Sequence, residues 1–283
     1  MRQRASHASQ FPEMNLKPIK HFLLAVQFFT RIPVKGRLAN WVGFDQEMQA
    51  RALSYFPLVG MIVGLLTSTI FLLLSFILPV IAATPWIASL FSVLFGLLLT
   101  GAIHEDGLAD LADGLGGSSS RERALEIMKD SSIGTYGALA LFGSLLSKVF
   151  LLTALAEINI WLASLALFGA HVVSRFMPVW VVRLLRYAGD LSNSKSSAMV
   201  ASKAAIWGAL CWALIGMGVL LYLAPSYVWL GAVAGCMLGF IVIYKLIKRR
   251  LGGYNGDCLG AVQQVCELGF YFGTLLFVPL VPL

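Results

Sequence analysis

Charged residues are scarce in this chain. Asp, Glu, Lys and Arg together make up 12% of its 283 residues, whereas hydrophobic residues make up 58%. Soluble domains carry about twice that share of charge, roughly 25%. The composition therefore excludes an ordinary water-soluble domain. It predicts an all-α fold, a polytopic integral membrane helix bundle surrounded by membrane lipid.

Two further absences narrow the class. The cysteines at positions 211, 236, 258 and 266 show no CxxC or Cys/His ligand spacing, so we expect small core residues rather than zinc ligands or disulfides. The polar N-terminal stretch, residues 1–18, has no compact apolar region followed by a small-residue cleavage site. We therefore expect a polar tail and no cleaved signal peptide.

Long apolar runs predict about six to seven transmembrane helices. A short first run, residues 19–29, is too brief to cross a bilayer and is followed by Pro33, which favours an interfacial or re-entrant helix. Spans are expected at 53–78, 85–102, 136–156, 160–182, 204–224, 228–247 and from 265 to the C-terminus.

Lys and Arg are missing from one side of this topology. The predicted loops at 79–84, 157–159 and 225–227 contain neither residue, whereas 19 of the 21 basic residues fall on the opposite side. The net charge of +7 therefore indicates positive-inside topology rather than a nucleic-acid-binding surface. We expect a multi-pass protein of the bacterial cytoplasmic (inner) membrane, with a cytoplasmic N-terminus and no nucleic-acid partner.

Acidic residues are concentrated in one stretch, residues 100–137, which holds seven of the fourteen. If the second span continues as a helix past the membrane surface, Asp106, Asp110 and Asp113 share one face at i, i+4 and i+7. Three carboxylates on adjacent turns repel one another, so a hard divalent cation such as Mg²⁺ or Mn²⁺ would stabilise them. The alternative is a solvated acidic helix end. The topology places this segment on the cytoplasmic side.

Two residues near this face are candidates for proton transfer. Asp130 ends a short amphipathic helix, and folding that helix back would bring its carboxylate opposite Asp106, as a further metal ligand or a general base. His104 is either an acid/base or phosphate-binding group or an interfacial residue bonded to backbone. Glu122 and Glu126 have the spacing of ordinary solvated helix residues.

Several polar residues elsewhere could face an anionic substrate. Arg31 is either a lipid-phosphate anchor or a substrate-phosphate contact. Arg175 lies inside a span, where charge is costly unless paired or facing a polar cavity, and with Arg186 it could form a basic wall opposite the carboxylates. Asn255 and Asp257 lie in a glycine-rich loop that could cradle phosphate or be a simple turn.

This combination suits Mg²⁺-dependent phosphoryl or phosphodiester transfer from a nucleotide-activated substrate. A cation-coupled membrane transporter is the alternative from another class, although its carboxylates would be expected nearer the bilayer midplane. A CDP-alcohol-type phospholipid synthase is a second enzyme alternative. Its D-G-x-x-A-R pattern would require Arg where this chain has Asp110.

The chain also resembles the cobalamin synthase family of adenosylcobinamide-GDP ribazoletransferases. The segments FFTRIPV, YFPLVG, GAIHEDGLADLADG, LEIMKDSSIGTYGALAL and LGGYNGDCLGA follow the family's order over nearly the whole chain. The resemblance implies a single membrane-embedded domain, residues 1–283, with residues 100–137 as its catalytic segment. Glu105 departs from the family, which usually has an apolar residue there, so its role is unassigned.

The resemblance implies a specific reaction. A ribose hydroxyl of α-ribazole, or of its 5′-phosphate, attacks the cobinamide-side phosphorus of adenosylcobinamide-GDP. GMP leaves, and adenosylcobalamin or its 5′-phosphate forms with Mg²⁺ as cofactor, which completes the nucleotide loop. The sequence leaves the oligomeric state open, a homo-oligomer included.

These roles can be assigned to residues as a hypothesis. We expect Mg²⁺ to be held by Asp106, Asp110, Asp113 and Asp130. Asp130 or His104 is the expected base for the ribose hydroxyl. We expect the phosphates of the substrate to contact Arg31, Arg175 and Arg186. We expect the nucleotide or the ribazole to contact Asn255 and Asp257.

Overall fold

The computed structural model describes residues 16–44, 46–188, 202–224 and 227–278. Nearly all of these residues are helical, and the β-type pairing within them is an isolated bridge between Tyr187 and Tyr254. The all-α fold expected from composition is confirmed. The polar tail expected at residues 1–18 lies mostly outside the described residues, and helix α1 (Lys17–Phe29) begins within it.

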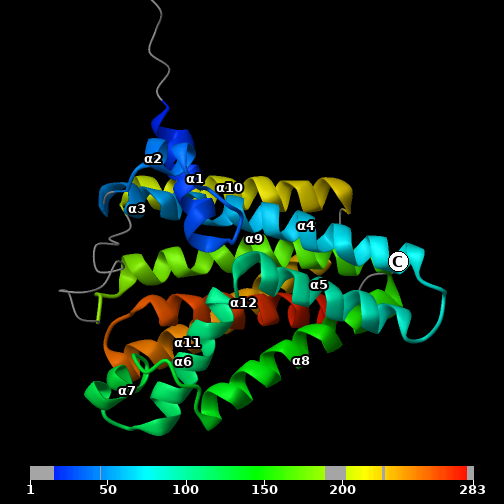
Figure 1. The fold of residues 1–283 in the computed structure, drawn as a ribbon. Helices are drawn as coiled ribbons and strands as arrows, with labels where there is room; N and C mark the ends of the chain where they lie inside the picture. Colours follow the sequence, from blue (N-terminus) through cyan, green and yellow to red (C-terminus); the bar gives the residue numbers. More distant parts are fainter. Residues whose placement is uncertain (1–15, 45, 189–201, 225–226, 279–283) are drawn as a thin grey trace, which may run out of the picture.

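Long helices run roughly lengthwise through the molecule, and short ones gather at one end (Figure 1). The long helices are α4 (Phe56–Ile77), α5 (Thr84–Thr100), α8 (Thr135–Ile158), α9 (Ile160–Leu184), α10 (Lys203–Leu223), α11 (Val228–Leu251) and α12 (Gly256–Phe277). The short elements are α1, α2 (Arg37–Val42), α3 (Gln46–Ala52), a 3-10 turn (Leu53–Tyr55), α6 (Ile103–Gly117) and α7 (Arg121–Ile127). We call the end that carries these short elements the α6 end.

Helix α9 forms the centre of the bundle. Of its apolar segment 78% is buried, against 33% for α8, α10 and α11. Large apolar side chains such as Leu98, Leu139 and Phe142 are exposed on the outer faces. In a bilayer these faces meet lipid tails, so the outside of the bundle can be as apolar as its core.

In the part of the chain that the structure describes, five helical segments are long and apolar enough to cross a membrane, or six if α5 and α6 form one broken span. The five are Met48–Ile77, Thr135–Ile158, Ile160–Leu184, Lys203–Leu223 and Val228–Leu251. Among the described residues, this finding agrees with the expected polytopic membrane bundle. Helix α12 occupies the place of the seventh, but it carries Gln263, Gln264 and Glu267, which make it less apolar.

The second expected span stops short of the acidic segment. Gly101 and Ala102 both adopt left-handed backbone conformations, with φ of 70° and 57°, and α6 leaves α5 at 90°. The expectation that one helix continues past the membrane surface is therefore wrong. Left-handed backbone ends a right-handed helix, and the Arg31 side chain occupies the space that a Cβ on Gly101 would need.

Helices α11 and α12 pack backbone to backbone through glycines. A Cβ on Gly235 would overlap the carbonyl oxygen of Gly269, and a Cβ on Gly231 would lie 2.6 Å from the carbonyl oxygen of Gly273. Small residues allow helices in membranes to approach this closely. The contact fixes the position of α12, whose first turn carries Asp257.

Candidate functional site

Helices α6 and α12 meet at the α6 end with their backbones in contact. A Cβ on Gly107 would lie 2.7 Å from the carbonyl oxygen of Asp257, and a Cβ on Gly260 would lie 3.0 Å from that of His104. The absence of a side chain on both glycines permits this approach. The contact brings Asp257 beside the carboxylates of α6.

Asp106, Asp110 and Asp257 form a carboxylate cluster at this contact, outside the apolar spans. Burial, followed by the charges of Asp110 and Asp106, raises the pKa of Asp257 to about 7. Burial and the charges of Asp106 and Asp113 raise the pKa of Asp110 to about 6. Each carboxylate opposes ionisation of its neighbours, so a cation bound here would stabilise all of them.

The carboxylate cluster has the donor chemistry that Mg²⁺ prefers. Within the described ranges, no group of three His, Cys, Asp or Glu side chains is arranged so that it could hold a metal ion by itself. Mg²⁺ sites that act on nucleotides often consist of one or two carboxylates completed by water and substrate phosphates. The carboxylates of Asp106, Asp110 and Asp257 fit this kind of site.

Asp113, the third carboxylate of the expected metal-binding face, has other partners. It is buried, and its two carboxylate oxygens accept hydrogen bonds from the backbone N–H groups of Gly134 (2.7 Å) and Gly137 (2.8 Å). These N–H groups belong to the N-terminus of α8, where a negative charge is favourable. The structure therefore uses Asp113 to hold the start of α8 against α6.

Asp130 lies in an open hollow whose lining includes Asp113 but not Asp106. Its exposed side chain accepts a hydrogen bond from the backbone N–H of Ser132 (2.9 Å), which lowers the pKa of the carboxyl. The expected position opposite Asp106 is therefore not observed. Helix α7 folds back onto the Gly114 end of α6, and this places Asp130 near Asp113 instead.

An aromatic cavity of about 160 Å³ lies beside the carboxylate cluster. Asp106, Asp257 and His104 line it together with Phe28, Phe29, Leu53, Phe56, Ile103, Pro178, Gly256, Leu259 and Gly260. His104 is buried, and its Nε2 has no hydrogen-bond partner in the described part of the chain. Burial lowers the pKa of His104 well below its usual range.

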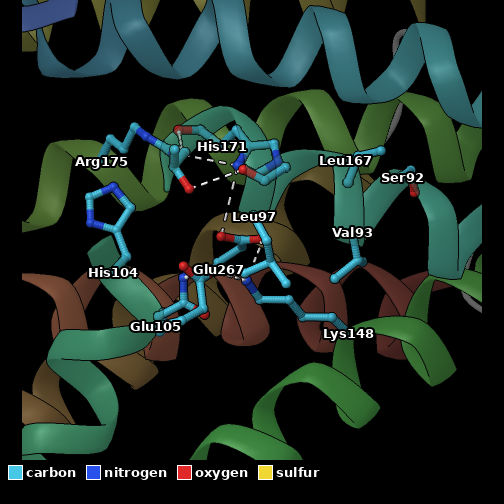
Figure 2. Close-up of a pocket in the computed structure, with 13 residues that line it drawn as sticks. Ser92, Val93, Leu97, His104, Glu105, Lys148, Leu167, His171, Arg175 and Glu267 are labelled. Atoms are coloured by element: carbon cyan, nitrogen blue, oxygen red, sulfur yellow. Dashed lines mark hydrogen bonds and ion pairs between the residues drawn. The ribbon is translucent and has the colours of Figure 1, made fainter. Parts of the chain in front are cut away.

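A buried polar cluster fills the bundle interior next to His104 (Figure 2). It consists of Glu105, Lys148, His171, Arg175, Gln263, Gln264 and Glu267. Lys148 Nζ lies 3.3 Å from Glu105 Oε1 and 3.2 Å from Glu267 Oε1, and Gln264 Nε2 donates to Glu105 Oε1 (2.8 Å). Glu105 therefore faces the interior, whereas the next residue, Asp106, lines the aromatic cavity.

Arg175 belongs to the buried polar cluster and not to an exposed basic wall. Its side chain is buried, and its Nη1 lies 2.9 Å from His171 Nδ1 and 3.1 Å from the His171 carbonyl oxygen. Arg186 lies on the segment after α9 and is exposed. Its carbonyl oxygen accepts a hydrogen bond from the Tyr254 N–H (2.9 Å). The two arginines are thus not brought together.

Arg31 and Asn255 both support the local architecture. Arg31 is exposed, its N–H donates to the carbonyl oxygen of Leu99 (2.7 Å), and its side chain covers the bend between α5 and α6. Asn255 caps α12 by accepting a hydrogen bond from the Cys258 N–H (3.0 Å), and its Nδ2 donates to Asp257 Oδ2 (2.8 Å). Asn255 therefore orients the carboxylate of Asp257 within the carboxylate cluster.

Sequence reasoning missed two parts of this region. The first is the polar set on α12, Gln263, Gln264 and Glu267, although three polar side chains in an apolar helix are themselves a signal that they are paired. The second is the aromatic cavity. Its walls come from segments far apart in the sequence, and no local pattern connects them.

The sequence of this chain is similar to those of a known protein family. The cobalamin-5-phosphate synthase family profile matches residues 21–275. The chain is 46% identical over 271 residues to the adenosylcobinamide-GDP ribazoletransferase of Albidiferax ferrireducens, covering 90% of this chain and 97% of that protein. It is 42% identical over 270 residues to the Polaromonas sp. protein of the same name (90% and 96% covered). It is 39% identical over 262 residues to the one from Vibrio cholerae (91% and 94% covered).

No solved structure matches the chain. The sequence matches confirm the resemblance carried by the motifs, and they extend over the described elements from α1 to α12. The chain therefore belongs to the cobalamin-5-phosphate synthase family.

Proposed function

We propose that this chain is a Mg²⁺-dependent transferase that joins α-ribazole, or its 5′-phosphate, to adenosylcobinamide-GDP and releases GMP. The names of the relatives supply the substrate. The structural observation that supports the proposal is the carboxylate cluster of Asp106, Asp110 and Asp257 beside a cavity large enough for an organic substrate.

The transfer makes one P–O bond and breaks another. A ribose hydroxyl oxygen bonds to the cobinamide-side phosphorus, the bond from that phosphorus to the bridging oxygen breaks, and GMP leaves with the electron pair. Asp257 is the proposed acceptor of the hydroxyl proton, because its carboxylate lines the aromatic cavity together with Asp106. Asp106 and Asp110 would hold Mg²⁺, which supplies charge stabilisation for the pyrophosphate and the leaving group.

We also propose that the α6 end faces the cytoplasm across a bacterial inner membrane. Basic residues are concentrated on elements of this end, including Arg31, Arg37, Arg121, Arg123, Lys129 and Arg250. Positive residues are retained on the cytoplasmic side of membrane proteins. This orientation would expose the carboxylate cluster to nucleotide substrates and Mg²⁺.

The test is an assay of the purified full-length protein in lipid nanodiscs. Incubation with adenosylcobinamide-GDP, α-ribazole and Mg²⁺ should release GMP, and EDTA should abolish the release. Absence of GMP from folded protein would overturn the proposal. A cation-coupled transporter or a CDP-alcohol phospholipid synthase would not release GMP from this substrate pair, so the same assay distinguishes the alternatives.

A further inference from the structure

The aromatic cavity adjoins the carboxylate cluster, because two members of the cluster, Asp106 and Asp257, also line the cavity. The rest of its lining is mostly apolar: Phe28 and Phe29 come from the end of α1, Phe56 from the start of α4, and Leu259 from α12. The rings of Phe29 and Phe56 are stacked with centroids 4.0 Å apart. Flat aromatic walls favour a flat aromatic ligand, since stacked and edge contacts between rings add to the burial of apolar area.

Few polar groups are available inside this cavity. Apart from the two carboxylates, the polar side chain in its lining is His104, which is 4% exposed and whose Nε2 has no partner among the described residues. A buried polar atom without a partner is costly. It therefore marks the place where a ligand atom would form a hydrogen bond.

We propose that this cavity binds the dimethylbenzimidazole base of the incoming ribazole, with His104 Nε2 hydrogen-bonded to the base nitrogen that is free of the ribose. The proposal rests on the proposed function and adds a subsite to it. A volume of about 160 Å³ suits a two-ring heterocycle and excludes a corrin.

Guanine, the other base in the reaction, fits this lining poorly. Guanine carries several hydrogen-bond donors and acceptors around its rim, and the apolar walls would leave most of them without partners, which disfavours its binding. Dimethylbenzimidazole has methyl groups on its rim and one free ring nitrogen. A base seated here would place its ribose next to Asp106 and Asp257, where the reacting hydroxyl is required.

The experiment compares the KM values of the two substrates in variants of the cavity wall. Leu259→Phe narrows the cavity from α12, and Phe56→Leu removes a ring from its lining. Each should raise the KM for α-ribazole about tenfold, the effect of losing about 1.4 kcal/mol of binding energy. The KM for adenosylcobinamide-GDP should stay within twofold of wild type. Phe150→Leu is the matched control, since Phe150 is 51% exposed and neither Phe150 nor its ring partner Trp86 lines the cavity.

A binding measurement on the wild-type protein completes the test and does not depend on the variants folding. Free 5,6-dimethylbenzimidazole should inhibit competitively against α-ribazole and raise the thermal unfolding midpoint. A rise in the KM for adenosylcobinamide-GDP alone would assign the cavity to that substrate and overturn the inference. Unchanged KM values together with no effect of dimethylbenzimidazole would also overturn it. In both of these cases the wild-type protein would still release GMP. If the proposed function were wrong, the wild-type protein would release no GMP.

Discussion

Two adjacent acids, Glu105 and Asp106, have opposite surroundings at the start of α6. Glu105 is 6% exposed and paired with Lys148 inside the bundle, whereas Asp106 lines the aromatic cavity beside Asp257. Neighbouring residues on a helix point about 100° apart, so one residue can anchor the helix while the next faces substrate. The role that the sequence left unassigned for Glu105 is therefore structural.

At Asp257, removal of the negative charge should abolish catalysis without unfolding the protein. Asp257→Asn keeps the size of the side chain but removes the proton acceptor, and we expect kcat to fall at least 100-fold, in the range of about 10²–10⁴ for a positioned base. GMP release at saturating Mg²⁺ measures this. Glu126→Gln is the control, since Glu126 is exposed and pairs only with Arg123 in the described structure. Near-normal turnover of Asp257→Asn would exclude Asp257 as the base.

The stability of the metal-free protein should depend on pH through Asp110 and Asp257. Their pKa values, about 6 and about 7 in the fold, lie above the value of about 3.9 for an unfolded Asp. The folded chain thus binds these protons more tightly, so stability should fall as pH rises from about 4 to about 7 and then level off. Thermal unfolding in detergent with EDTA, from pH 5 to pH 8, measures this slope.

The Asp257→Asn variant should show a shallower slope of unfolding temperature against pH, and Glu126→Gln should match wild type. Mg²⁺ should raise the unfolding temperature more at pH 8 than at pH 5, because its carboxylate ligands are then ionised. An identical slope in Asp257→Asn and wild type would show that Asp257 does not titrate in this range.

At the scale of the elements, the contact between α6 and α12 creates the carboxylate cluster. Gly107→Ala would introduce a Cβ 2.7 Å from the backbone of Asp257 and push the two helices apart. Since a displacement of about 1 Å at a reacting group can cost 10²-fold, we expect GMP release to fall by at least tenfold. Gly143→Ala on α8 is the matched control, because a Cβ there meets no atom within 4 Å. Equal activity of the two variants would argue against this positioning role.

The buried polar cluster holds α6, α8, α9 and α12 together. Its two carboxylates and its two cations balance one another in charge. Lys148→Met would leave Glu105 and Glu267 without their shared cation, and we expect destabilisation of about 3 kcal/mol or more. The double variant Lys148→Met, Glu105→Gln should recover part of this loss, because one cation and one carboxylate are removed together and Glu267 keeps the charge of Arg175 nearby. Thermal unfolding in detergent measures both. Equal stability of the single variant and wild type would show that the pairs do not stabilise the bundle.

At the scale of the whole molecule, the orientation in the membrane decides which solutes reach the carboxylate cluster. In a Cys211→Ser background, Ser119→Cys lies at the α6 end and Ala82→Cys lies in the loop between α4 and α5. A membrane-impermeant maleimide should label the cysteine at position 82 in intact spheroplasts. It should label the one at position 119 only after the membrane is opened. The reverse pattern would invert the proposed topology.

The fold class, the face of α6 that carries Asp106 and Asp110, and the family all follow from the sequence alone. The low charge content and long apolar runs determined a membrane helix bundle, because unpaired charge and unsatisfied backbone are both costly in lipid. The i, i+4 spacing of Asp106 and Asp110 placed both carboxylates on one helix face, since helical periodicity is a local property. The motifs from FFTRIPV to LGGYNGDCLGA identified the family.

Other features were decided by the tertiary structure, because they depend on which segments meet. The left-handed backbone at Gly101 and Ala102 turns α6 across the bundle, and close packing at Gly107 then adds Asp257 to the carboxylate cluster. Packing of α6 against the start of α8 gives Asp113 its partners there, and Asp130 lies outside the carboxylate cluster. Sequence spacing reports the face of a single helix, whereas the partner of that face is set by contacts between distant segments.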